Sequence, residues 1–299
     1  MKILVTGGHG LLGTYLQKEM EGIYLSSKDF NLTKESEVIK MYETHQPDVV
    51  VHLAGKAGGM FDHMKNPFYY LEENILMNTY VMKYAHEFNV KKFVGTLSTC
   101  IYRDVAENYP LVEEELYEGQ PHEFHIGYAY SKRLMGIHIN VAKKQGLNYS
   151  YVVPSNLYGL YETGDITRKH FVGALIDKII KANINGDKKI TILGDGSPLR
   201  QFTYTEDVAK IIARVVKEDV SVNMNIATPE NLSIAEMVRQ ALIATDSQHL
   251  EVEWDTTQPN GQYRKDVSIE KLQTAFPDFQ FTSFVDGIRK THEELKKKY

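Results

Sequence analysis

The sequence predicts an α/β protein built on a doubly wound parallel sheet, with a smaller C-terminal α/β region. Apolar runs recur through the first half of the chain, and they are continuous rather than alternating. Continuous runs are typical of strands that are buried on both faces, as in a parallel sheet. Helical patterns separate these runs, which is the arrangement that lets helices cover both faces of such a sheet.

The expected elements alternate regularly until about residue 160. Strands are expected at 2–6, 23–25, 48–53, 92–97 and 149–154, and helices at 11–20, 35–45, 68–88 and 128–145. Beyond that point the alternation weakens, and further helices are expected at 170–182, 206–217, 233–244 and 283–297. We therefore expect a first domain over residues 1–160, with a return segment near 200–225, and a second, smaller domain over most of 161–299.

Composition excludes several classes of protein. The chain has 299 residues, of which 42% are hydrophobic and 24% charged, as in ordinary globular domains. A formal net charge of −5 gives no basic footprint for nucleic acid. No apolar stretch approaches the roughly 20 residues of a membrane span, and the N-terminus lacks the apolar core of a signal peptide. A single cysteine, Cys100, allows no intrachain disulfide, so we expect a cytoplasmic protein without nucleic-acid or membrane partners.

A glycine-rich loop, TGGHGLLG at 6–13, follows the first expected strand directly and opens the first helix. Three glycines spaced three residues apart allow a tight turn and a close approach of the backbone to a pyrophosphate at the helix N-terminus. This context favours dinucleotide binding over a turn that is merely rich in glycine. The first domain is thus expected to be a Rossmann domain, and the second to bind mainly the substrate. The expected cofactor-binding residues are Gly7, Gly10, Leu11, Leu12, Gly13, Ser26, Ser27, Lys28, Leu53, Ala54 and Lys132.

The second expected strand is followed by Ser26, Ser27 and Lys28, and these residues indicate which dinucleotide is bound. An acidic residue at this place would bind the ribose 2′-hydroxyl and favour NAD. Two hydroxyls and a cation suit a 2′-phosphate better. The sequence therefore predicts NADP(H), and the nearby Asp29 leaves NAD open as the alternative. No metal site is assigned.

Tyr128 and Lys132 are four residues apart in an expected helix, so their side chains lie on one face of it. An ammonium beside a phenol lowers the phenol pKa, which lets the phenol exchange a proton with a carbonyl or an alcohol. Ser98 ends an earlier strand, at the edge where parallel sheets bind ligands. We therefore expect Ser98 to hold a substrate carbonyl oxygen that Tyr128 protonates.

The glycine loop and the set of Ser98, Tyr128 and Lys132 resemble the extended short-chain dehydrogenase/reductase family. Further stretches resemble its GDP-L-fucose synthase branch: 53–78, STCIY at 98–102, PSNLYG at 154–159, RKHFVGALI at 168–176, GDGSPLRQF at 194–202 and PNGQYRKDV at 259–267. The resemblance implies an NADPH-dependent enzyme that epimerises GDP-4-keto-6-deoxy-D-mannose at C3 and C5 and reduces C4, giving GDP-L-fucose. It also implies a homodimer, formed through the helices at 68–88 and 128–145.

The resemblance also assigns roles to individual residues. Cys100 matches the base that removes the C3 and C5 protons, and His170 matches the acid on the opposite face. A ketone at C4 acidifies both protons, and a thiol and an imidazole titrate near enough to neutral pH to serve as this pair. Arg200 matches a contact to the nucleotide diphosphate, and Lys265 matches a further substrate contact. Asn156 is expected to line the sugar pocket.

Some residues depart from the pattern of that branch. His122 and His125 precede the tyrosine, and we interpret them as solvent-exposed loop residues. Leu193 stands where the branch often places a tryptophan against the substrate. Two alternatives stay open: a C4-reductase for another nucleotide-linked 4-keto sugar, such as a heptose or a 3,6-dideoxyhexose, and a non-catalytic dinucleotide-binding sensor. The intact Ser98, Tyr128 and Lys132 argue against the sensor.

Overall fold

The computed structural model describes residues 1–160, 171–258 and 260–299. A six-stranded sheet in the order β10-β5-β4-β3-β1-β2 forms the centre of the protein, and every neighbouring pair of strands in it is parallel. These strands are β1 (Ile3–Thr6), β2 (Ile23–Leu25), β3 (Val49–His52), β4 (Lys92–Thr96), β5 (Asn148–Pro154) and β10 (Met224–Ile226).

The order of the strands reverses at β1. The chain leaves β1 on one side to form β2 and returns on the other side to form β3. Thr6 pairs with Leu25 of β2 and with His52 of β3, so the three strands end together. Open parallel sheets bind ligands at the carboxyl ends of their strands, beside such a reversal. The glycine loop, which follows β1, therefore lies at the expected binding edge.

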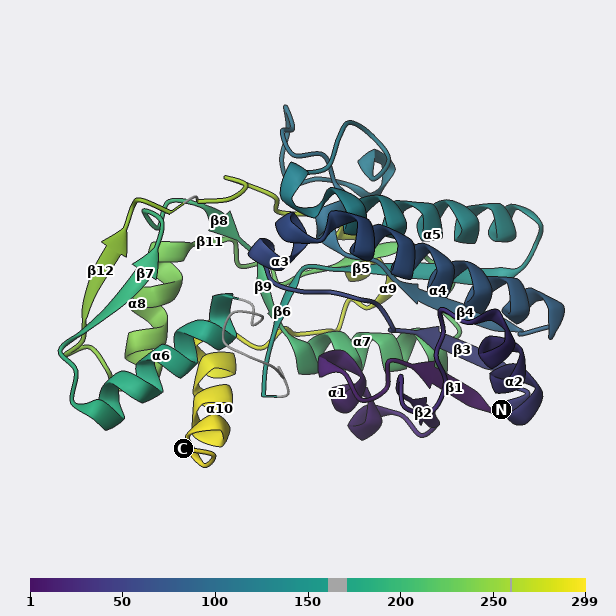
Figure 1. Cartoon of the computed structure of the whole chain (residues 1–299), viewed down its shortest axis with the longest axis horizontal. Coiled ribbons are helices and arrows are strands. Elements are labelled where there is room, and N and C mark those ends of the chain that lie inside the picture. Colours follow the sequence, from purple (N-terminus) through teal and green to yellow (C-terminus); the bar gives the residue numbers. More distant parts are fainter. Residues whose placement is uncertain (161–170, 259) are drawn as a thin grey trace.

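Helices cover both faces of the sheet (Figure 1). α1 (Leu11–Glu19) and α7 (Thr205–Lys217) pack against each other on one face. α2 (Glu35–His45), α4 (Pro67–Glu87) and α5 (Ile126–Lys144) form the layer on the other face, where α4 contacts both of its neighbours. The sheet is thus buried from both sides.

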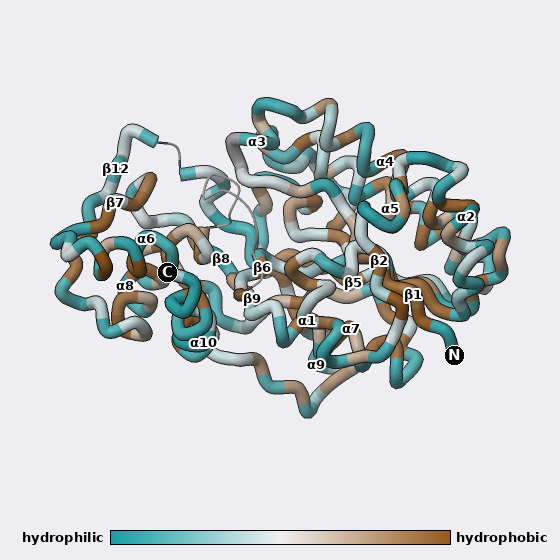
Figure 2. The backbone as a smooth tube through the Cα atoms, turned by 60° about the horizontal axis from the view of Figure 1, so that its bottom comes forward, coloured by the Kyte–Doolittle hydropathy of each residue, from teal (hydrophilic) through white to brown (hydrophobic). Residues whose placement is uncertain are grey.

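Neighbouring residues of one strand enter opposite cores. Val5 and Val51 belong to the core beneath α1 and α7, whereas Leu4 and Val50 belong to the core beneath α2, α4 and α5. Because side chains alternate across a strand, burial on both faces requires consecutive apolar residues. This explains the continuous apolar runs of the sequence, which Figure 2 shows as hydrophobic backbone through β1 and β2.

A smaller region lies beside the sheet and contains short strand pairs and helices (Figure 1). The pairs are β6 (Asn156–Tyr158) with β9 (Phe202–Tyr204), β7 (Lys189–Leu193) with β12 (Glu251–Asp255), and β8 (Leu199–Arg200) with β11 (Leu232–Ser233). The longer helices are α6 (Phe171–Asn185), α8 (Ile234–Ala244) and α10 (Phe284–Lys296). Shorter helices elsewhere are α3 (Met60–Lys65), α9 (Glu270–Ala275), η1 (Thr99–Ile101), η2 (Glu113–Glu115) and η3 (Glu123–His125).

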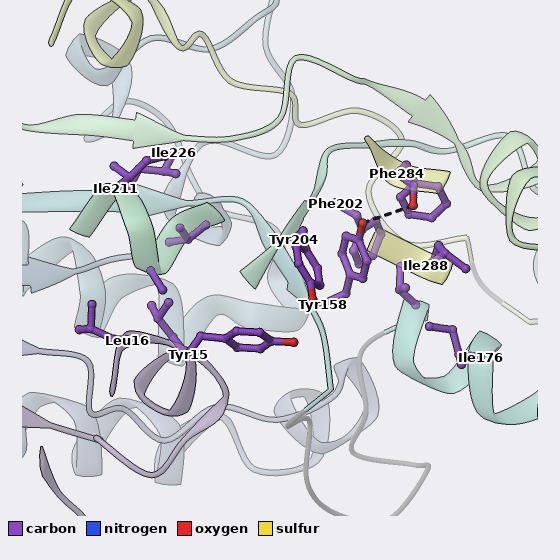
Figure 3. Packing of buried hydrophobic residues seen from close by; sticks show 14 of the residues in the cluster. Tyr15, Leu16, Tyr158, Ile176, Phe202, Tyr204, Ile211, Ile226, Phe284 and Ile288 are labelled. Carbon is purple, nitrogen blue, oxygen red and sulfur yellow. Dashed lines mark hydrogen bonds between the residues drawn. The ribbon is translucent and has the colours of Figure 1, made fainter. Parts of the chain in front are cut away.

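Four aromatic side chains form a row that links this smaller region to α1, the first helix packed on the sheet (Figure 3). Tyr15 of α1 meets Tyr204 edge-on, with ring centroids 5.8 Å apart, and Tyr204 lies 5.6 Å from Tyr158. Tyr158 lies 5.6 Å from Phe284 of α10 and donates a hydrogen bond to its carbonyl oxygen. Buried aromatic pairs stabilise beyond the area they bury. The two regions therefore share one continuous core.

The sheet and its two helical layers confirm the predicted doubly wound parallel fold with a smaller C-terminal α/β region. The helix expected from residue 128 begins at Ile126, and the strand expected to reach residue 97 ends at Thr96. α7 and β10 lie in the layers of the sheet although they come after residue 200, and we keep the division into 1–160 and 161–299 as a proposal. None of the helices within the described ranges is long and apolar enough to cross a membrane.

Candidate active site

A cavity of about 720 Å³ opens at the carboxyl ends of β1, β2 and β3. The predicted cofactor residues that line it are Gly7, Gly10, Ser26, Ser27, Lys28, Leu53 and Ala54. A cavity of this size at the reversal of strand order has the place and the volume for a dinucleotide.

Backbone geometry explains the glycines of the loop. Gly7 has φ +69°, and a Cβ there would lie 2.7 Å from the backbone nitrogen of Ala54. A Cβ on Gly13 would lie 2.5 Å from the carbonyl oxygen of Gly7, so this glycine lets α1 pack against the loop. Gly10 caps α1, whose first amides have no acceptor within the helix. The loop therefore fits a pyrophosphate.

Leu11 and Leu12 begin α1 beside this loop. Among the described residues, the lining of the cavity includes neither of them, nor Gly13. The Leu12 side chain is buried in the core beneath α1, and Leu11 packs against that core. The backbone amides of the first turn are the groups through which these residues would contact a cofactor, and that contact stays a prediction.

The loop after β2 carries the residues expected to choose between the two dinucleotides. Asp29 accepts hydrogen bonds from both the amide and the hydroxyl of Ser26, each at 2.7 Å. These two bonds lower the pKa of Asp29. One carboxylate oxygen, Oδ2, is thus bonded within the loop, and Ser27, Lys28 and Asp29 are all exposed at the cavity wall.

Three of the predicted catalytic residues, Ser98, Cys100 and Tyr128, lie together. Ser98 caps η1, where its Oγ accepts a hydrogen bond from the amide of Cys100 at 3.4 Å. Burial raises the pKa of Tyr128 above its ordinary value, the Cys100 thiol adds to this shift, and a hydrogen bond with Ser98 opposes it. A phenol that stays protonated at neutral pH can donate a hydrogen bond, and then a proton, to a carbonyl oxygen.

Lys132 follows Tyr128 by one turn of α5. Its Nζ lies 5.8 Å from the centroid of the Tyr128 ring and donates a 2.8 Å hydrogen bond to the carbonyl oxygen of Thr96. The same Nζ is 3.3 Å from where a Cβ on Gly55 would stand, so it reaches the backbone that lines the cofactor cavity. Burial lowers the pKa of Lys132 to about 8. The expectation that Lys132 lowers the pKa of Tyr128 is therefore wrong in this structure, because burial dominates both groups.

Lys265 brings an ammonium to the cysteine. Its Nζ donates to Cys100 Sγ across 3.8 Å, although the two residues are far apart in the chain. Burial lowers the pKa of Lys265, the Cys100 thiol opposes this shift, and the charge of Arg200 adds to it. The predicted base and one predicted substrate-binding residue are thus direct neighbours.

Arg200, in β8, turns its guanidinium onto the segment that carries Lys265. It donates to the carbonyl oxygens of Leu199 at 2.7 Å, Tyr263 at 3.2 Å and Gln262. Burial lowers the pKa of Arg200 to about 10. The arginine therefore ties residues 262 and 263 to β8, and its contact with a diphosphate stays a prediction.

Two further predicted residues belong to the region beyond β5. Asn156 begins β6, where it is half-buried and pairs with Phe202 of β9. Its place in a sugar pocket stays a prediction. His170, the predicted acid, lies outside the described residues.

Two histidines lie near Tyr128: His125, which was expected near the entrance to the site as an exposed loop residue, and His63, which was not predicted. The ring centroid of His63, in α3, lies 5.4 Å from that of Tyr128 and 5.0 Å from that of His125. Burial lowers the pKa of His125 to about 3, and its Nδ1 has no hydrogen-bond partner within the described ranges. The interpretation of His125 as an exposed residue is wrong, because η3 packs against α3. His122 is also half-buried, since its Nδ1 caps η3 by accepting from the Phe124 amide.

No short-range pattern could have found His63. The helix α4, the strand β4 and the short helices η1, η2 and η3 separate it from α5, and only the packing of α3 against η3 brings the rings together. The signal for His125 was its place three residues before the tyrosine, at the entry to α5.

Comparisons with known proteins find relatives that match almost the whole chain. The profile of the NAD dependent epimerase/dehydratase family matches residues 3–227. A GDP-L-fucose synthase from Dictyostelium discoideum is 33% identical, over 97% of this chain and 93% of that protein. A GDP-L-colitose synthase from Yersinia pseudotuberculosis is 28% identical, over 97% of this chain and 96% of that protein. The crystal structure of a GDP-L-fucose synthetase from Naegleria fowleri bound to NADP is 30% identical, with a TM-score of 0.88 over 99% of this chain and 93% of that one.

Proposed function

Because this chain belongs to the NAD dependent epimerase/dehydratase family, we propose that it converts GDP-4-keto-6-deoxy-D-mannose to GDP-L-fucose with NADPH. At the level of the family it is an NAD(P)-dependent nucleotide-sugar epimerase/reductase. The finer proposal is supported above all by one observation: Cys100 donates its amide to Ser98 Oγ, and its thiol is close enough to Tyr128 to shift the pKa of that phenol. Reduction of a ketone needs a proton donor but no thiol, whereas inversion at C3 and C5 needs a base.

In the proposed reaction, Ser98 and Tyr128 hold the C4 oxygen of the sugar. Cys100 removes a proton from C3 and later from C5, and the two hydroxyls stabilise the enolate charge on that oxygen. His170 is proposed to return a proton from the opposite face, and Cys100 loses its proton to solvent while His170 regains one before the second inversion. When bound, the nicotinamide cofactor supplies the hydride for C4. Tyr128 then gives its proton to the C4 oxygen. Lys132, whose Nζ lies 5.8 Å from the centroid of the Tyr128 ring, supports the phenol electrostatically.

The proposed cofactor is NADP(H), held by the glycine loop, the backbone around Ala54, and the loop after β2. Its 2′-phosphate would lie against Ser27 and Lys28, which are exposed at the cavity wall. Asp29, the residue that could favour NAD, has its carboxylate bound by Ser26. Because these bonds engage one of the two carboxylate oxygens, fewer acceptor sites remain for a ribose hydroxyl, and this supports the choice of NADP(H).

A homodimer through α4 and α5 is proposed as well. Tyr130, Leu134, Ile137 and Val141 are each 40% to 50% exposed, and their spacing puts them on one face of α5. Phe68, near the start of α4, is 71% exposed. A contiguous stripe of exposed apolar side chains along a helix is typical of a surface that another subunit covers. We propose that this apolar face packs against the same face of a second subunit, because the interface of a two-fold dimer is formed by the same surface on both subunits.

The test is a reaction with GDP-4-keto-6-deoxy-D-mannose and NADPH in D₂O, with the product analysed by NMR. We expect a 6-deoxy sugar of galacto configuration, with deuterium at both C3 and C5. NADPH oxidation without deuterium at those carbons would contradict the epimerase assignment and leave a plain C4-reductase. Absence of any turnover would contradict this substrate.

A second candidate is a C4-reductase for another GDP-linked 4-keto sugar, such as a 3,6-dideoxyhexose or a heptose. The Yersinia relative, which is named for a different GDP sugar, favours keeping this candidate. The same assay with a 3-deoxy substrate separates the two: a higher kcat/KM for that sugar than for its 3-hydroxy counterpart would favour the second candidate. Turnover of either sugar would exclude a non-catalytic sensor.

A further inference from the structure

The contact between Cys100 and Lys265 has no part in the reaction as described so far. We propose that Lys265 is a positioning residue for Cys100: its amine takes the thiol proton and its ammonium then holds the sulfur as a thiolate. This inference deepens the proposed epimerisation, because a thiolate is the form of cysteine that can remove a carbon-bound proton.

The geometry of the pair carries the inference. Lys265 Nζ lies 3.8 Å from Cys100 Sγ, within the range of a hydrogen bond to sulfur. The segment around the lysine is anchored on both sides. Before it, Arg200 binds the carbonyl oxygens of residues 262 and 263. After it, Val267 donates to the Gln201 side chain at 2.9 Å. The ammonium is thus held at the sulfur by the fold.

The charges around the sulfur favour an anion there. Lys265, Arg200 and Tyr128 each interact electrostatically with Cys100. Arg200 is a cation, Lys265 becomes one when its amine takes the thiol proton, and Tyr128 is a phenol that burial keeps neutral. His125, which also faces Lys265, is kept neutral by burial. Cations beside a thiol favour the thiolate. An anion beside Lys265 also relieves the repulsion between that ammonium and Arg200.

The proposed proton transfers balance. The S–H bond of Cys100 breaks and an N–H bond forms on Lys265, so a neutral pair becomes an ion pair. The thiolate then takes a proton from C3 or C5, and the electrons of that C–H bond move through the carbonyl to the C4 oxygen. Ser98 and Tyr128 hold the resulting enolate. Lys265 therefore acts through Cys100.

The test uses the fact that Cys100 is the only cysteine in the chain. Iodoacetamide alkylates thiolates rather than thiols, and it is uncharged, so its approach is not steered by the lysine charge. Mass spectrometry of the whole protein therefore reports the alkylation of this one sulfur. For Lys265→Met we expect alkylation at about pH 7 to be at least about fivefold slower than for the wild type.

A second measurement at about pH 10 checks access to the sulfur, because an ordinary thiol is ionised there. The wild type and Lys265→Met should then react at the same rate. If alkylation of Lys265→Met were slower than that of the wild type by the same factor at both pH values, the substitution would only hinder access of iodoacetamide to the sulfur. This result would overturn the proposal. Equal rates at about pH 7 would overturn it too.

Three further variants sharpen the test. Arg264→Met removes the neighbouring cation, whose guanidinium binds Asp266 at 2.6 Å, and it should keep the wild-type rate. Lys265→Arg restores a positive charge and should recover most of the rate at about pH 7. Lys265→Gln takes the place of Lys265→Met if that variant fails to fold. No substrate is present, so failure here is distinct from failure of the proposed function, which the D₂O reaction tests.

Discussion

Lys132 and Thr96 are joined by a 2.8 Å hydrogen bond from the lysine Nζ to the threonine carbonyl oxygen. Thr96 is the last residue of β4, and the segment after it carries Ser98 and Cys100. Lys132 belongs to α5, one turn after Tyr128. One bond thus fixes the helix that carries the phenol to the strand end that carries the hydroxyl and the thiol.

Removal of the phenolic hydroxyl should abolish most of the reduction. Tyr128→Phe keeps the ring that lies over Lys132 but leaves no proton donor at the C4 oxygen. We expect kcat for NADPH oxidation to fall about 10²–10⁴-fold, the usual contribution of a general acid, with little change in KM. Tyr80→Phe, a change of the same kind in the helix α4, should keep the wild-type kcat. A loss below tenfold in Tyr128→Phe would exclude the phenol as the acid.

Gly7→Ala should remove cofactor binding. The residue has φ +69°, and the new Cβ would meet the Ala54 backbone at 2.7 Å in the wall of the cavity. Gly146→Ala is the matched control, because Gly146 has φ +87° with no atom within 4 Å of the added Cβ. That control should lose about 1 kcal/mol of stability and bind NADPH normally. Calorimetric titration with NADPH measures both variants, and equal affinities would contradict the steric argument.

Lys28→Ala should weaken the binding of NADPH and leave that of NADH unchanged. The ammonium is proposed to contact the 2′-phosphate, which NADH lacks, and loss of one charged hydrogen bond corresponds to about a tenfold change in affinity. Fluorescence titration with each dinucleotide measures the difference. Lys40→Ala, an exposed lysine of α2, is the control. An equal effect of Lys28→Ala on both dinucleotides would place the lysine elsewhere along the cofactor.

The free energy of unfolding should decrease when the pH is lowered, because of His52. This histidine is fully buried, bonds to Thr6 Oγ1 at 2.7 Å and Asn78 Oδ1 at 3.0 Å, and burial lowers its pKa to about 3. Its pKa in the unfolded chain is about 6.5, so between these values the unfolded chain binds more protons. The contribution of His52 is therefore complete above about pH 6.5 and declines below it, by up to about 1.4 kcal/mol per pH unit.

Urea unfolding at about pH 7.5 and about pH 5 measures this decline. His52→Gln should be less stable than the wild type at the higher pH, and it should lose less stability on acidification. His86→Gln, a change at an exposed histidine of α4, should follow the wild-type dependence. If His52→Gln also followed that dependence, His52 would not be the group that titrates.

Charge on the exposed face of α5 should separate the proposed dimer. Leu134→Glu combined with Ile137→Glu places two carboxylates per subunit in an apolar contact, where burying unpaired charge is unfavourable. We expect light scattering to report a monomer for this variant and a dimer for the wild type. Val105→Glu, at a residue that is 81% exposed, should leave the dimer intact. A wild-type monomer at micromolar concentration would contradict the proposal.

Much of this protein could be predicted from patterns within a few residues of each other. The helix at 35–45 and the strand at 23–25 have the predicted bounds, because apolar periodicity is a local consequence of burial on one face or two. The cavity residues Gly7 and Gly10 were predictable for the same kind of reason. A tight turn between a strand and a helix, with room for a pyrophosphate, restricts the sequence at that turn itself.

Other features depend on which elements pack together, and these required the tertiary structure. The contact of Lys265 with Cys100 joins the last third of the chain to η1, the turn that follows β4, and His63 reaches Tyr128 only through the packing of α3 against η3. The direction of the pKa shift of Tyr128 was wrong from sequence, because spacing identifies a neighbouring charge but does not measure desolvation. Local sequence thus specifies backbone geometry and periodicity, whereas the environment of a side chain is the sum of contacts from distant segments, and only the folded chain brings these segments together.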